Sequence, residues 1–177
     1  MQKGIKFAIV TPIEMKELEI KTLIKEVSYE ELTDTDRALV DRAKGATRRA
    51  YAPFSRYHVG AALQLADGTI VEGSNQENAA YPSGLCAERT AVFYASSAHP
   101  GVAVKKIAIA AWTAPKEGCS FDQGFQSNPV SPCGGCRQAL MEYEHLYGPI
   151  EVILYGRDRI FILPSVASLL PLGFTDF

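Results

Sequence analysis

The chain has 177 residues, of which 47% are hydrophobic and 21% are charged, and its formal net charge is −2 at pH 7. This composition is typical of one globular domain and excludes a largely disordered chain. The near-neutral charge, without a long basic run, excludes the usual footprint of a nucleic-acid or membrane-surface binder.

Short basic pairs and short apolar runs lead to the same exclusions. We interpret the basic pairs at 48–49 and 105–106 as solvated faces. No apolar run reaches the roughly 18 residues that a membrane span needs, and the run at 7–10 is too short for a secretion signal. We therefore expect a cytoplasmic protein, and in a reducing compartment clustered cysteines serve as metal ligands or catalytic groups more often than as disulfides.

The N-terminal residues 1–32 form an extension of uncertain structure, and Met15 offers an alternative start to Met1. Residues 18–24 alternate as a half-buried strand does, although apolar residues at helical spacing are also present. We favour a strand or extended arm.

A helix is predicted after this extension. Thr33 is a candidate N-cap with Asp36 three residues on, and Pro53 ends the helix. Asp67-Gly68 between two apolar runs then predicts a β-hairpin over 58–75.

The remaining elements alternate between helices and strands. We expect helices at 86–99 and 133–146, strands at 104–112, 150–156 and 159–163, a loop at 113–130, and a short helical tail at 165–174. This order predicts one α/β domain over residues 33–177, a three-layer sandwich with a mixed five-stranded sheet between helices.

Three of the four cysteines stand at predicted helix starts. Cys133 and Cys136 are three residues apart, so both sulfurs of a first helical turn can face one point, and Cys86 would be a third ligand from another helix. A catalytic zinc takes three protein ligands and leaves a fourth position for water. Helix N-termini also favour the thiolate that a metal needs.

Two other interpretations compete with a catalytic zinc. The C-x-x-C pair could be a redox dithiol, or Cys119 could complete a closed structural site. Structural sites usually pair close ligands on both sides, and Cys86 has no such partner. We interpret Cys119, in the unpatterned loop, as a bystander. His58, His99 and His145 lie outside ligand-like spacing.

Glu88, two residues after Cys86, separates these interpretations. Its structural alternative is a carboxylate that interacts with a helix dipole. A dithiol or a structural zinc has no use for it, whereas a zinc-activated water needs a group to shuttle its proton. A glutamate followed later by Pro-Cys-x-x-Cys, here at 132–136, is the arrangement of zinc deaminases.

Two arginines fit a site with three thiolates, which would leave a net charge of −1 around Zn²⁺. Arg89 and Arg137 each follow a cysteine closely in the sequence. Hydrogen bonds from their guanidinium groups to ligand sulfur would offset that charge.

Four ordered blocks, at 50–63, 73–93, 131–140 and 169–174, resemble the cytidine deaminases, in particular the small homotetrameric type. The resemblance extends over about residues 38–175. It implies that Cys86, Cys133 and Cys136 bind one Zn²⁺ per subunit and that Glu88 is the general acid/base.

The resemblance also implies substrate contacts. Asn75 and Glu77 match the pair that holds the ribose hydroxyls, and the backbone of Ala87 matches a contact with the base. Tyr57 matches a pocket position that is usually Phe in the family. Phe174 matches an aromatic residue that a neighbouring subunit stacks on the base, which implies a homotetramer with shared active sites.

We therefore expect zinc-dependent hydrolytic deamination of cytidine and 2′-deoxycytidine to uridine and 2′-deoxyuridine in pyrimidine salvage. The partner is a small nucleoside, with no nucleic acid and no membrane. One alternative is another cytosine nucleoside, such as a blasticidin-like antibiotic, selected by the pocket near Tyr57 and by an apparent insertion at 115–130. The other alternative is a non-enzymatic protein that is stabilised by zinc or senses redox state, and the presence of Glu88 argues against it.

Overall fold

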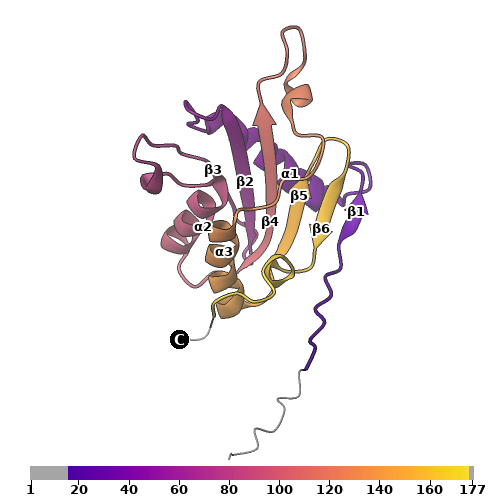
Figure 1. The fold of residues 1–177 in the computed structure, drawn as a ribbon, viewed down its shortest axis with the longest axis vertical. Helices are drawn as coiled ribbons and strands as arrows, with labels where there is room; N and C mark the ends of the chain where they lie inside the picture. Colours follow the sequence, from indigo (N-terminus) through magenta and orange to yellow (C-terminus); the bar gives the residue numbers. More distant parts are fainter. Residues whose placement is uncertain (1–15, 176–177) are drawn as a thin grey trace, which may run out of the picture.

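The computed structural model describes residues 16–175 and is built on one mixed sheet (Figure 1). Its strands are β1 (Lys25–Val27), β2 (Tyr57–Leu65), β3 (Ile70–Ser74), β4 (Val104–Thr113), β5 (Glu151–Tyr155) and β6 (Ile160–Leu163). They lie in the order β1-β6-β5-β4-β2-β3. The central pair β4 and β5 is parallel, and the other pairs of this sheet are antiparallel.

Helices cover both faces of the sheet (Figure 1). On one face α1 (Asp34–Ala46) packs through Leu39 and Val40; on the other, α2 (Ala87–Ala98) and α3 (Gly134–Tyr147) pack through Val92 and Leu140. The predicted three-layer α/β fold is therefore confirmed. Both faces of β4 are covered, which explains its nearly continuous apolar run.

The sheet has six strands where five were predicted, because β1 adds an edge strand from the N-terminal extension. Only Lys25–Val27 pair with β6, and the alternating residues 18–24 form no strand and are exposed. Leu32 is buried in the core under α1. Residues 25–32 are thus integrated with the rest of the fold, while Met1 and Met15 lie outside the described residues.

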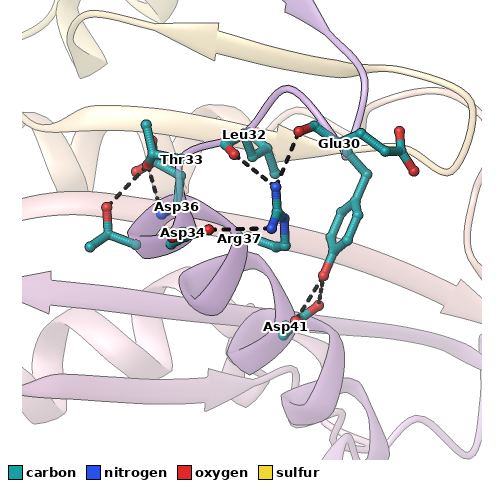
Figure 2. A network of polar contacts seen from close by, with 9 residues as sticks. Glu30, Leu32, Thr33, Asp34, Asp36, Arg37 and Asp41 are labelled. Atoms are coloured by element: carbon teal, nitrogen blue, oxygen red, sulfur yellow. Dashed lines mark hydrogen bonds and ion pairs between the residues drawn. The ribbon is translucent and has the colours of Figure 1, made fainter.

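Thr33 caps α1 as predicted, with its Oγ1 accepting from the Asp36 amide at 3.2 Å. The carboxylate of Asp36 accepts from the Thr33 hydroxyl and from Lys106 Nζ, at 2.7 and 2.6 Å (Figure 2 shows the surrounding network). The prediction that Lys106 lies on a solvated face is therefore wrong. The prediction that Pro53 ends this helix is wrong, because the helix ends at Ala46 and a 3₁₀ turn (Thr47–Arg49) follows it.

The predicted loop at 113–130 is more ordered than its sequence indicates. It contains a 3₁₀ helix (Phe121–Gly124), and Phe125 is 2% exposed against the ring of Tyr155, at 5.5 Å between centroids. Further 3₁₀ helices are Tyr81–Ser83 and Val166–Leu169. The latter replaces the predicted helical tail, which stops ahead of Pro171 because proline has no amide hydrogen to continue a helix. No helix within residues 16–175 has both the length and the apolar character to cross a membrane.

Candidate active site

The N-termini of α2 and α3 bring three cysteines together. Cys86 is the N-cap of α2, Cys133 is the N-cap of α3, and Cys136 lies in the first turn of α3. The Cys133 sulfur lies 3.8 Å from that of Cys86 and 3.4 Å from that of Cys136. All three are free thiols, and within residues 16–175 they form the one group of three or more potential ligands close enough to share a metal ion.

These thiols fit a zinc ion. Tetrahedral coordination with Zn–S bonds of about 2.3 Å places ligand sulfurs about 3.8 Å apart, and the three sulfurs lie within 4.8 Å of one another. Three thiols leave one tetrahedral position for another ligand. Cys86 and Cys133 also line a cavity, so that position is within reach of a small molecule.

The thiol cluster is poised to carry negative charge. A hydrogen bond from the Cys136 thiol, with help from the guanidinium of Arg89, lowers the pKa of Cys86 to about 5. The pKa of Cys136 is raised because that thiol shares its proton with the Cys86 sulfur and is buried. A cation that replaces the shared protons would be stabilised by the same sulfurs.

Glu88 stands beside the cluster in the first turn of α2. It is 4% exposed and lines the cavity, and no ion pair to it is present within the described residues. Burial raises the pKa of its carboxyl above the ordinary value. A buried carboxyl with a raised pKa next to a metal-ligand set is suited to moving protons.

The cavity has a volume of about 720 Å³, which suits a small organic molecule. It reaches from the thiols to the turn before β2 and to the segment after β3. Phe54 and Tyr81 stand in its wall with their rings edge to face, at 6.1 Å between centroids. Neither residue was predicted from the sequence as a site residue, and neither were Val130 and Ser131 in the wall ahead of Cys133.

Asn75 and Glu77 both line this cavity and are both held by backbone atoms. Asn75 donates to Tyr57 O at 2.9 Å and accepts from Val59 N at 2.8 Å. Glu77 Oε2 accepts from Phe54 N at 2.8 Å, and its hydrogen bonds to Ser55 and Phe54 lower the pKa of the carboxyl. The side chains are thus oriented in advance, and each keeps hydrogen-bonding capacity for a ligand.

Three further predicted substrate residues occupy different places. Tyr57 lines the cavity, and burial raises its pKa. Ala87 is fully buried in the first turn of α2 and does not line the cavity. Phe174 is 67% exposed, its backbone is paired with the side chain of Gln138, and it does not line this chain's cavity.

The two arginines differ in what they contact. Arg89 Nη2 lies 3.9 Å from the Cys86 sulfur. Arg137 instead donates to the carbonyls of Pro132 and Leu169, both at 2.8 Å, where the sequence suggested a bond to sulfur. Because those carbonyls are strong acceptors within reach, Arg137 fastens the residue before Cys133 to the C-terminal 3₁₀ helix. Cys119 is exposed and outside the thiol cluster.

The comparisons with known proteins agree on one family. The family model "Cytidine and deoxycytidylate deaminase zinc-binding region" matches residues 33–147. A cytidine deaminase from Sporosarcina psychrophila is 41% identical over 138 residues, which cover 77% of this chain and 89% of the relative. A probable cytidine deaminase from Dictyostelium discoideum is 32% identical over 133 residues, which cover 75% of this chain and 78% of the relative.

Solved structures give the same result. The crystal structure of a cytidine deaminase from Burkholderia pseudomallei is 38% identical with a TM-score of 0.64, covering 81% of this chain and 100% of that one. The cytidine deaminase of Mycobacterium tuberculosis is 30% identical with a TM-score of 0.60, covering 81% and 99%.

Proposed function

The chain belongs to the cytidine and deoxycytidylate deaminase family, and we propose that it hydrolyses cytidine and 2′-deoxycytidine to uridine and 2′-deoxyuridine with release of ammonia. The observation that carries this proposal is the buried carboxyl of Glu88 beside three converging thiols, where Glu88, Cys86 and Cys133 line one cavity of about 720 Å³. We further infer a role in cytoplasmic pyrimidine salvage. The net charge of −2 favours a nucleoside over a polynucleotide substrate.

Cys86, Cys133 and Cys136 would hold one Zn²⁺ per chain. The bound ion would supply a Lewis acid that lowers the pKa of water toward neutrality. Arg89, close to the Cys86 sulfur, offsets part of the charge of three thiolates and so preserves that acidity.

Glu88 is the proton carrier of the proposed reaction. Its carboxylate takes the proton of the attacking water as the C4–O bond forms, and it delivers that proton to N3. It then moves the proton of the new hydroxyl to the amino group, and the C4–N bond breaks with release of ammonia. One water is consumed, and Glu88 returns to its starting state.

Asn75 and Glu77 would bind the sugar hydroxyls, the first with its remaining amide hydrogen and the second with Oε1. Because backbone atoms already fix both side chains, little conformational entropy is lost on binding. Tyr57 would line the pocket. The contact of the Ala87 backbone with the base rests on the family resemblance alone, because Ala87 is fully buried and does not line the cavity. Binding energy from these remote contacts positions C4 for attack.

Phe174 would act in a neighbouring subunit of a homotetramer by stacking on the base there. Its exposure and its place outside this chain's own cavity support that assignment. Phe174→Ala should raise KM for cytidine while zinc content stays the same. An unchanged KM would contradict a shared active site.

The proposal is tested by the ultraviolet absorbance of cytidine. The wild-type protein should contain one zinc per chain and convert cytidine, and Glu88→Gln should keep the zinc and lose turnover. Equal turnover in Glu88→Gln, or wild-type protein without zinc, would overturn the mechanism. Turnover of a blasticidin-like compound but not of cytidine would establish a different cytosine nucleoside as the substrate.

A further inference from the structure

The segment that leads into Cys133 is fastened to the turn between β5 and β6. We call residues 126–131 the strap. The backbone amide of Arg157 donates to Gln126 O at 2.8 Å, and that of Asp158 donates to Ser127 O at 3.0 Å. Two consecutive backbone hydrogen bonds fix the strap in register against the turn.

Two arginine side chains of the same turn extend this contact. Arg157 Nη2 donates to Ser127 Oγ at 2.9 Å. Arg159 donates from both Nε and Nη2 to the side-chain oxygen of Asn128, at 2.9 and 2.6 Å. A planar guanidinium that donates twice to one oxygen fixes orientation as well as distance.

Gly156 lets the strap lie directly on the turn. A Cβ atom at this position would come within 2.6 Å of Asn128 C and of Pro129 N, both backbone atoms. Backbone cannot move aside as the end of a flexible side chain can, so a larger residue would displace the strap.

The other end of the strap belongs to the cavity. Val130 and Ser131 line its wall, and Cys133 follows two residues later. No residue of the turn at 156–159 lines the cavity. The turn therefore has no direct contact with a molecule in the cavity, and the strap is a segment that connects the two.

We propose that Arg159 and Asn128 are positioning residues for substrate, because their contact sets the place of the cavity wall formed by Val130 and Ser131. This inference rests on the proposed nucleoside deamination. A displaced wall weakens the ground state and the transition state alike, so KM rises while kcat changes little.

The test is a double-mutant cycle with cytidine as substrate. Arg159→Ala and Asn128→Ala should each raise KM about tenfold, and the double variant should raise it no further because both changes remove one contact. Arg159→Lys, which can still donate one hydrogen bond, should give an intermediate KM. All four variants should keep one zinc per chain.

Glu26→Ala is the matched control, because Glu26 forms an ion pair with Arg159 at 3.8 Å and has no hydrogen bond or ion pair to the strap within the described residues. Its KM should equal that of the wild type. If Arg159→Ala and Asn128→Ala lower the thermal midpoint and leave KM unchanged, the contact is merely structural and the inference is overturned.

Gly156→Ala displaces the strap by a steric route and should raise KM as well. A wild-type protein that does not deaminate cytidine would overturn the proposed function together with this inference.

Discussion

The N-termini of α1 and α2 lie on opposite faces of the sheet and are built in opposite ways (Figure 1). At α1, Thr33 caps the helix and exchanges hydrogen bonds with Asp36, which also pairs with Lys106. Arg37 donates to two backbone carbonyls, and Tyr29 donates to Asp41 (Figure 2). Most of these polar groups have a partner supplied by the fold, although the buried Nε of Arg37 has none among the described residues.

At α2 the N-cap is Cys86, whose side chain caps no amide. Glu88 is buried there without an ion pair within the described residues, whereas the buried carboxylate of Asp36 at α1 pairs with Lys106. A polar cluster satisfied by its own fold stabilises the protein, whereas groups left unsatisfied at a cost in stability are characteristic of functional sites. Changes at α2 should therefore cost activity, and changes at α1 should cost stability.

The largest effect is expected for Glu88→Gln. We expect kcat to fall about 10³-fold or more, because the amide cannot carry the proton. The free energy of unfolding should stay the same or rise, since a buried carboxyl is replaced by a neutral isostere. Cytidine turnover and urea unfolding measure the two quantities. A large loss of stability in Glu88→Gln would contradict the comparison, because it would show that the α2 terminus contributes to folding as the α1 terminus does.

The reverse outcome is expected for Asp36→Asn. The amide leaves Lys106 without one of its two carboxylate partners, and we expect a loss of about 2 to 3 kcal/mol in urea unfolding, less than for a fully buried pair because Lys106 is 27% exposed. KM and kcat should not change. Asp34→Asn, on the same turn but fully exposed, is the matched control and should leave stability unchanged. A loss of activity without a loss of stability would contradict the comparison.

These two termini also show what the sequence could predict. Cys133 and Cys136 lie in one helical turn, and Glu88 lies one turn or less from Cys86, so local spacing alone indicates which side chains converge. The contact between Asp36 and Lys106 joins residues 70 positions apart, and no local pattern encodes it. For the same reason Arg137 could be placed near the cysteines but its carbonyl acceptors could not be foreseen.

The fold likewise divides into elements that local patterns predict and elements that depend on contacts between distant residues. Helices and central strands with clear periodicity were predicted well, because their apolar faces repeat along a single element. β1 was misplaced by a few residues because its position depends on pairing with β6, which lies more than 130 positions further along the chain. The order of the strap and of Phe125 comes from contacts with the β5–β6 turn and with Tyr155, which exist only after the sheet has formed.

A smaller effect is expected for the cap of α1. Thr33→Ala removes the acceptor for the Asp36 amide and should lower the free energy of unfolding by about 1 kcal/mol. Thr33→Ser keeps the hydroxyl and should retain most of the stability. Cytidine turnover should be the same in both variants, and a change in kcat would show that the two faces of the sheet are coupled.

The smallest effect is expected for Tyr29→Phe, and it depends on pH. Burial, followed by the hydrogen bond to Asp41, raises the pKa of the Tyr29 phenol from 10.0 to about 12. The folded state therefore binds the phenol proton more tightly than the unfolded state, so this contribution is complete below pH 10 and is lost as the pH rises toward about 12. Because the phenol is partly exposed, Tyr29→Phe should cost less than about 1 kcal/mol at neutral pH.

Urea unfolding of wild type and variant across this alkaline range gives the test. The wild type should lose its advantage over Tyr29→Phe as the pH rises from 10 toward 12. Tyr94→Phe, at an exposed position on α2, should follow the wild-type curve. Parallel curves for wild type and Tyr29→Phe would mean that the hydrogen bond to Asp41 contributes nothing to folding. The polar network at α1 would then be satisfied without being stabilising, and hydrogen-bond satisfaction alone would not distinguish the two helix termini.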